Sequence, residues 1–182
     1  MSVRGIIIYL ARALSLALPA AALLYTLRRL RLQKAGIRPS KKRESIVLVF
    51  YLYFLCLIAI TAIRRGEHLT DFWRIPHDNS TIQLTPIIVT LQQGRAGAWY
   101  LIYPIAGNIL WFLPFGFLLG ILRPQYSLWR IALYSLLLSC AIEVSQWVLM
   151  SGISDIDDVI FNLMGGILGR GLARVVDKRN RT

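Results

Sequence analysis

The sequence predicts an all-α membrane protein, a polytopic helical bundle of about five transmembrane helices with one short outer re-entrant or interfacial helix. Hydrophobic residues make up 56% of the 182 residues, and the mean hydropathy is +0.56. Apolar runs recur at the length of about 20 residues that a helix needs to cross a bilayer. The bases that give the net charge of +12 lie between these runs, so they indicate membrane topology and no nucleic-acid partner is expected.

Five apolar stretches are long enough to span: roughly residues 5–27, 46–63, 100–122, 131–149 and 159–176. The first stretch resembles a secretory signal, since Arg4 precedes an apolar run that contains the small residues Ala20, Ala21 and Ala22. However, Arg28 and further bases follow at once, which favours an uncleaved helix. Cys56 and Cys140 fall inside predicted helices, where we expect them to pack rather than form a disulfide.

Loop charge predicts the orientation of the chain. Residues 28–45 carry eight Lys or Arg against one acid, residues 123–130 carry two, and the tail from Arg170 carries five. These segments follow the first, third and fifth spans, so all three lie on the same side of the membrane. The positive-inside rule places that side in the cytoplasm. The sequence therefore predicts a multi-pass protein of the cell membrane with its N-terminus outside and its C-terminus cytoplasmic.

Two predicted loops then face outward: residues 64–99 and 150–158. Within the first, residues 84–89 predict a short apolar helix, with Thr85 as its cap and Pro86 at its first position. This helix is too short to span, so we expect it to cover the outer mouth of the bundle.

Polar side chains line one face of each of three predicted spans. In the fourth span, Ser135, Ser139, Glu143 and Gln146 fall within about 80° of one another on a helical wheel. In the fifth, Asp158 and Asn162 share a face with three glycines, of which Gly165 and Gly169 have the spacing that permits close helix packing. Asn108 lies at a similar depth in the third span.

The acidic cluster Asp155, Asp157 and Asp158 places three of the nine acids within four positions, at the start of the fifth span. The helix from Val159 to Gly169 has only 11 residues before Arg170, and such a helix covers about 17 Å of a core about 30 Å thick. We therefore expect an outward-facing, carboxylate-lined pocket that is closed toward the cytoplasm.

This cluster is compatible with several chemistries. A catalytic reading uses Glu143 and Asp158, with Glu143 as a general base. A binding reading uses the amides and carboxylates together, and these residues are Asn108, Gln146, Asp155, Asp157 and Asn162. Asp155 and Asp158 are also the candidate ligands of a divalent cation such as Mg²⁺ or Ca²⁺, which prefers oxygen ligands.

Structural readings stay open beside these. Ser154 and Asp157 have the spacing of a capping box, with Asp in place of Glu. Glu143 can be a structural acid paired with Arg95 or Arg64 from the outer loop. Asn108 and Asn162 can simply form hydrogen bonds between helices.

Three short motifs in order resemble the VanZ-like family: Asn108-x5-Pro114-x-Gly116, Glu143-x2-Gln146, and Asp155-x-Asp157-Asp158-x3-Asn162-x2-Gly165. The resemblance covers residues 84–172. It implies a small bacterial integral membrane protein and a link to low-level resistance to the glycopeptide teicoplanin, which is a process and a location rather than a reaction. One departure is that many members have an Arg shortly before the acidic cluster, where this chain has Ser151, Gly152, Ile153 and Ser154.

The predicted organisation has three parts: residues 1–83 with two spans, a basic cytoplasmic loop and an outer loop; a VanZ-like membrane domain over 84–176; and a basic cytoplasmic tail over 177–182. The expected role is in cell-envelope processes or teicoplanin tolerance, with the lipid bilayer and either envelope precursors or a glycopeptide as partners. The alternatives are a hydrolase or transferase on lipid-linked envelope precursors that uses Glu143 and an Asp-bound cation, a structural or partner protein without catalysis, and a transporter.

Overall fold

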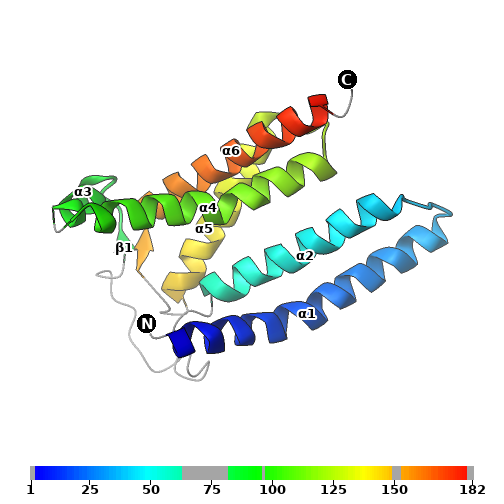
Figure 1. The fold of residues 1–182 in the computed structure, drawn as a ribbon, viewed down its shortest axis with the longest axis horizontal. Helices are drawn as coiled ribbons and strands as arrows, with labels where there is room; N and C mark the ends of the chain where they lie inside the picture. The colour runs from blue at the N-terminus through cyan, green and yellow to red at the C-terminus, as the bar shows by residue number, and fades with distance from the viewer. Residues whose placement is uncertain (1–2, 63–81, 96, 149–152, 180–182) are drawn as a thin grey trace. The chain divides into compact units, whose positions relative to one another are not determined.

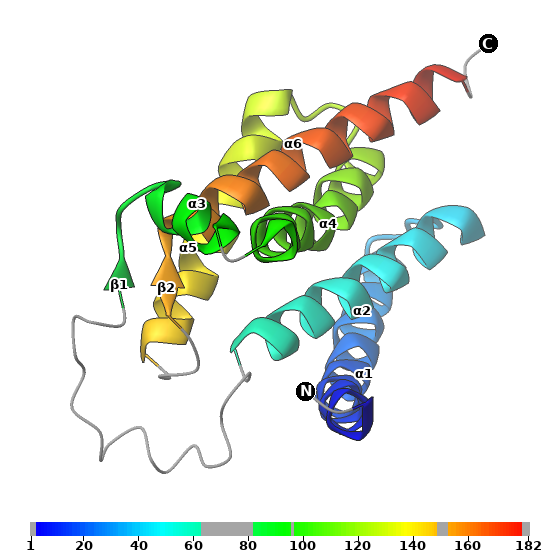
Figure 2. The same ribbon diagram turned by 60° about the vertical axis from the view of Figure 1, so that its left-hand side comes forward.

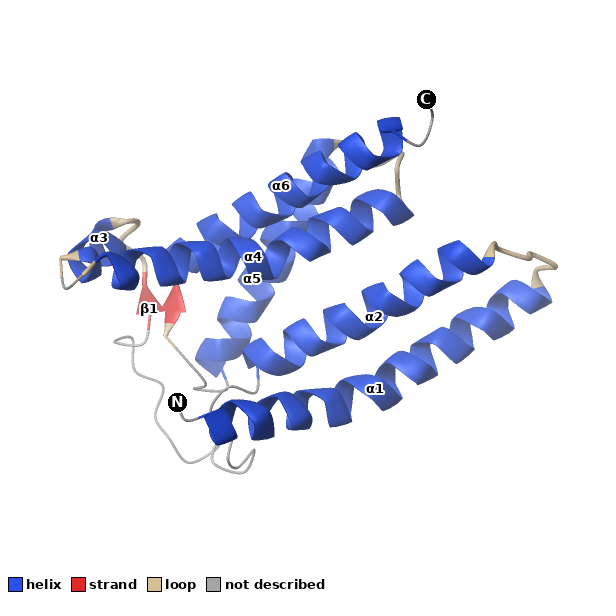
Figure 3. Cartoon of the chain, viewed as in Figure 1, coloured by secondary structure: helices blue, strands red, loops and turns tan. Residues whose placement is uncertain are grey.

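The computed structural model is almost entirely helical and describes residues 3–62, 82–95, 97–148 and 153–179 (Figure 1). The chain divides into two compact units, Met1–Ile63 and Arg64–Thr182. Five of its helices are long and apolar enough to cross a membrane, which confirms the predicted class and the number of spans. Among the described residues, strand structure is confined to two short segments, which are red in Figure 3.

The first unit is a hairpin of two helices, α1 (Val3–Lys34) and α2 (Lys41–Ala62). Ala13, Ala17 and Ala21, which recur every four residues along α1, are buried. Small side chains at this spacing let two helix backbones approach closely. Near the turn, Arg28 Nη2 lies 2.9 Å from Glu44 Oε1, so an ion pair joins the two helices.

The second unit contains three long helices, α4 (Ala98–Leu122), α5 (Leu128–Val148) and α6 (Ile156–Arg179). The short helix α3 (Ile88–Gly94) precedes α4. The strands β1 (Ile82–Gln83) and β2 (Ser154–Asp155) pair in parallel, with Ile82 opposite Ser154 and Gln83 opposite Asp155 (Figure 2). The segment that includes β1 and α3, here called the β1–α3 segment, is thereby joined to the acidic turn that starts α6.

Glycines bring α6 against both of its neighbours. A Cβ on Gly165 would lie 2.4 Å from the carbonyl oxygen of Ile109, and a Cβ on Gly169 would lie 2.1 Å from that of Leu113. Both contacts are with α4, as expected for this spacing. Gly166 faces the other way, since a Cβ there would lie 2.0 Å from Ser135 Oγ on α5.

Arg170 closes the opposite end of the second unit. Its guanidinium is 5% exposed and donates to the carbonyl oxygens of Gly120 at 3.2 Å, Pro124 at 2.8 Å and Tyr126 at 2.9 Å. These carbonyls lie at the end of α4 and in the turn before α5. Arg170 therefore joins α6 to the end of α4 and to the turn that leads into α5, a role that the sequence did not predict.

The β1–α3 segment differs from the expectation at the start of its helix. This helix begins at Ile88 rather than at Pro86, and it ends at Gly94. Ile87, just before it, has a left-handed backbone with φ of 64°, which a β-branched residue adopts only when its surroundings impose it. Arg64, which we expected to be able to pair with Glu143, lies outside the described residues.

Candidate functional site

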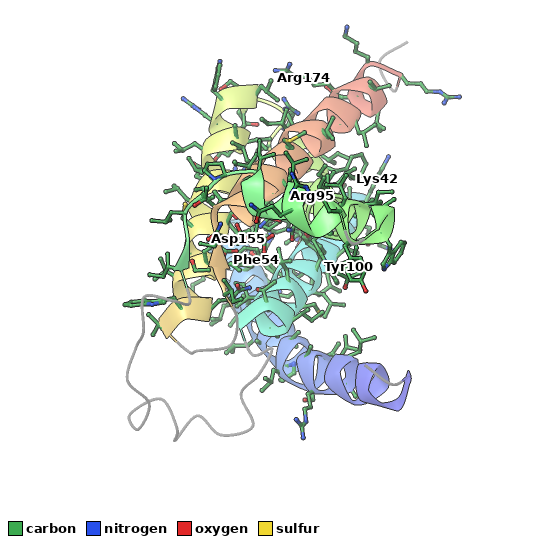
Figure 4. All side chains as sticks on the ribbon, turned by 90° about the vertical axis from the view of Figure 1, so that its left-hand side faces the viewer. Lys42, Phe54, Arg95, Tyr100, Asp155 and Arg174 are labelled. Carbon is green, nitrogen blue, oxygen red and sulfur yellow. The ribbon has the colours of Figure 1, made fainter. Side chains whose placement is uncertain are left out.

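The candidate site lies where α4, α5, α6 and the β1–α3 segment meet, at the start of α6. Figure 4 looks toward this end of the second unit and labels Asp155 on it. The site is built from the three aspartates of the acidic cluster, from Glu143 on α5 and from Asn108 on α4. Each carboxylate has a different set of partners.

Asp157 is the most deeply buried of the acids, with 2% of its surface exposed. Its Oδ1 accepts a hydrogen bond from the Ile87 backbone N–H at 2.6 Å, and its Oδ2 accepts one from the Thr90 hydroxyl. Asp157 therefore holds the start of α3, including the left-handed residue. The predicted capping role was too local, because the partners lie 70 and 67 positions earlier in the chain.

Glu143 is also buried, with 5% of its surface exposed. Its Oε2 accepts a hydrogen bond from the Asp155 backbone N–H at 2.8 Å. Asp155 and Asp158 both lie close enough to act on Glu143 by charge repulsion. The structure thus brings the Glu143 carboxylate on α5 close to those of Asp155 and Asp158, which lie 12 or more positions later in the chain.

Asp158 connects α6 to α4, because its Oδ1 accepts a hydrogen bond from the Asn108 amide. One turn further along α6, Asn162 donates from its amide nitrogen to Ser139 Oγ on α5 at 2.9 Å. Both amides therefore form the hydrogen bonds between helices that the sequence left open as a structural reading.

Asn162 also carries a polar atom with unmet hydrogen-bonding capacity. The residue is 4% exposed, and its amide oxygen is buried without a hydrogen-bond partner. Such an atom is costly in an apolar interior. One turn further along α6, Gly166 packs closely against Ser135 of α5.

Gln146 lies on the same face of α5 as Glu143 and is 7% exposed. The predicted polar face of this helix, made of Ser135, Ser139, Glu143 and Gln146, is buried at all four positions. Asn108, Glu143, Asp155, Asp157 and Asp158 are joined by hydrogen bonds or by electrostatic proximity, whereas Asn162 bonds to Ser139.

The site is rich in acceptors and negative charge. Asp155, which is only half-buried, accepts from the Asp157 backbone N–H at 2.9 Å. Burial raises the pKa of the Asp155 carboxyl above its ordinary range, and the nearby Asp157 carboxylate adds to the increase. Among the described residues no Lys or Arg acts on Glu143 or Asp155. Arg95, which we predicted as a partner of Glu143, lies among the described residues. It is exposed and forms no ion pair with a described acid.

A metal ion would need several of these side chains to converge. Within the ranges that the structure describes, no three His, Cys, Asp or Glu side chains are arranged to hold one. Asp155 and Asp158 each have a carboxylate oxygen in a hydrogen bond within the protein. Their predicted role as Mg²⁺ or Ca²⁺ ligands stays a prediction.

Comparison with known proteins places this geometry in a family. The family model of VanZ/LLP1 matches residues 50–177, more than half of the chain. The chain belongs to the VanZ/LLP1 family. It is 35% identical to the protein VanZ of Enterococcus faecium over 71 residues, which are 39% of this chain and 44% of that protein. The chain thus spans less than half the length of this relative, and no solved structure matches it.

Family membership and the five apolar helices together make this VanZ-family chain a multi-pass membrane protein. The family match covers α4, α5 and α6, and therefore every residue of the candidate site on these helices. Two residues of the site were missed from sequence. Thr90 and Ile87 contact Asp157 only because of tertiary packing, and the apolar character of residues 84–89 gave no signal for a hydrogen bond there.

Proposed function

We propose that this VanZ-family protein acts in the cell envelope, where its carboxylate site faces outward and binds a ligand that carries positive charge or several hydrogen-bond donors. The observation that carries the proposal is the proximity of Glu143, Asp155 and Asp158 at the start of α6. One helical turn after Asp158, the buried amide oxygen of Asn162 has no hydrogen-bond partner. Carboxylates at the end of a membrane helix are costly to hold unless something neutralises them. A ligand that brings donors would meet this requirement.

The outward direction is supported by the charge of the chain. The segment of eight bases joins α1 to α2, and the two bases of residues 123–130 lie between α4 and α5. The acidic cluster lies at the other end of α5, before α6. By the positive-inside rule the cluster is then extracytoplasmic, where it can meet envelope precursors or an antibiotic.

The family supplies the process for this proposal. The similar protein is named VanZ, and the motifs described above resemble those of a family linked to teicoplanin resistance. We infer that this chain contributes to teicoplanin tolerance through the carboxylate site. The site then acts on the antibiotic itself or on an envelope component that changes its access.

Teicoplanin susceptibility of a sensitive Gram-positive host tests the proposal. Native protein, Asp155→Asn and Glu143→Gln are compared at matched membrane abundance, because both changes remove charge with little change of shape. Asp177→Asn, the same chemistry on α6 but far from the cluster, is the control. We expect protection by the native protein and the control, and loss of protection in the two site variants.

The outcomes separate the readings. No protection by the native protein overturns the link to tolerance. Equal protection by all variants removes the carboxylates from the mechanism. Cysteine labelling at position 155, in a variant whose Cys56 and Cys140 are serines, tests the orientation, since labelling only from the cytoplasm would contradict an outward site.

A second candidate function is a purely structural role for these acids. The bonds from Asp157 to Ile87 and Thr90, and from Asn108 to Asp158, favour it. It predicts that Glu143→Gln lowers the folded abundance and the protection together. The enzymatic alternative, with Glu143 as base and an Asp-bound cation, instead predicts chelator-sensitive turnover of a lipid-linked precursor.

A further inference from the structure

The turn between α1 and α2 carries a dense group of bases that the proposed function does not use. We call residues 28–43 the basic hairpin. It contains eight Lys or Arg and no acid, and Glu44 follows it directly. Arg28 forms its ion pair with Glu44, whose side chain is 6% exposed. The seven other bases are all exposed: Arg29, Arg31, Lys34, Arg38, Lys41, Lys42 and Arg43.

The hairpin presents these bases on ordered backbone rather than on a loose loop. α1 ends at Lys34, and Gly36, two residues later, has a left-handed backbone with φ of 67°. The Ile37 N–H donates a hydrogen bond to the Leu32 carbonyl at 2.9 Å. This pattern is the usual C-terminal stop of a helix. Ser40 then starts α2, because its hydroxyl accepts from the Arg43 N–H at 3.3 Å.

The length of α1 places this group at a membrane surface. Its 32 residues extend about 48 Å, whereas the hydrocarbon core is about 30 Å thick. The last turns therefore pass into the headgroup region. Apolar side chains are exposed among the bases there, since Leu30 is 49% and Ile37 is 56% exposed. This mixture suits a lipid interface better than bulk water.

The number and positions of the bases exceed what topology requires. Residues 123–130 carry only two, although they give the same topological signal. Lys41, Lys42 and Arg43 also lie in the first turn of α2, where the positive end of the helix dipole disfavours cations. Phosphate groups nearby would offset both the crowding of charge and the dipole.

We propose that the basic hairpin binds the headgroups of anionic phospholipids. Each base near an anionic membrane surface adds to such binding, and groups of four to eight bases beside a span are typical of it. The binding does not depend on the carboxylate site. It fixes the depth of α1 and α2 in the bilayer through contacts with lipid phosphates.

Thermal unfolding of the full-length protein in a neutral detergent tests the proposal. The probes are short-chain phosphatidylglycerol, short-chain phosphatidylcholine and inorganic phosphate. The variant is Arg38→Gln, Lys41→Gln, Lys42→Gln, and Lys42 is labelled in Figure 4. The matched control removes three exposed bases elsewhere, with Arg123→Gln, Arg174→Gln and Lys178→Gln.

We expect phosphatidylglycerol, but not phosphatidylcholine, to raise the unfolding temperature of the native protein. Its apparent affinity should fall about tenfold or more in the hairpin variant and change little in the control. An equal loss in the control would show nonspecific attraction and overturn the proposal. So would an equal effect of inorganic phosphate, which would indicate a small-anion site, or equal effects of the two lipids.

Discussion

The contact between Gly116 and Gly166 gives a quantitative test of how α4 and α6 are held together. A Cβ on Gly116 would lie 1.9 Å from the Gly166 carbonyl oxygen, whereas an ordinary contact is at least 3.4 Å. Gly116→Ala therefore requires the two backbones to separate by about 1.5 Å. Because the obstacle is backbone rather than a flexible side chain, no rotamer change can relieve it.

The cost follows from the contacts that this separation weakens. A gap of about 0.5–1 Å already forfeits a quarter to a half of the dispersion energy of a contact. Overpacking costs typically 1–3 kcal/mol and occasionally more. The separation also strains the Asn108–Asp158 hydrogen bond between the same helices. We expect Gly116→Ala to lower the free energy of unfolding by about 3 kcal/mol.

A matched control exists on the same helix. A Cβ on Gly107 meets nothing within 4 Å, so Gly107→Ala should be neutral or stabilise by about 0.5–1 kcal/mol through helix propensity. Both variants are unfolded reversibly in micelles with increasing SDS and followed by tryptophan fluorescence. If they differ by less than about 0.5 kcal/mol, the close packing of α4 on α6 is refuted.

Three further predictions use the same unfolding measurement. Arg170→Lys should lower the free energy of unfolding by about 2–3 kcal/mol, because one ammonium cannot reach all three carbonyls. The control Arg174→Lys, at an exposed position, should change it little. Equal losses would contradict the bridging role of Arg170. Ile87→Gly should raise the free energy of unfolding by about 1 kcal/mol, because glycine adopts the left-handed backbone without strain. Leu91→Gly, inside α3, should lower it by a similar amount. Destabilisation at both positions would show that the backbone at Ile87 is not strained. Because the pKa of Asp155 is raised on folding, the folded state holds its proton over a pH window in which the unfolded chain has released it. Stability should therefore fall as pH rises from the ordinary aspartate pKa to the raised one, and Asp155→Asn should flatten this fall; an unchanged profile in the variant would assign the pH dependence to another group.

The parts of the fold that follow a helical repeat were predictable. The spacing of Ser135, Ser139, Glu143 and Gln146 predicted a polar face, and all four are buried. The spacing of Gly165 and Gly169 predicted a close helix contact, and both glycines meet α4 backbone. Patterns of this kind are local, so one helix is enough to reveal them.

The long-range contacts were not predictable for a physical reason. Asp157 binds the Ile87 N–H, and Arg170 binds the carbonyls of Gly120, Pro124 and Tyr126. Backbone N–H and C=O groups are present at almost every residue, so the sequence does not mark which of them a buried charge will meet. Only the packing of the helices selects the partners.

The bonds of Asp157 also set an order of events during synthesis. Its partner Thr90 leaves the ribosome 67 residues earlier, and translation adds about 5–20 residues per second. For roughly 3–13 seconds, α3 and its left-handed residue exist without the carboxylate that holds them. The segment that includes β1 and α3 therefore gains its carboxylate partner only after the start of α6 has been synthesised.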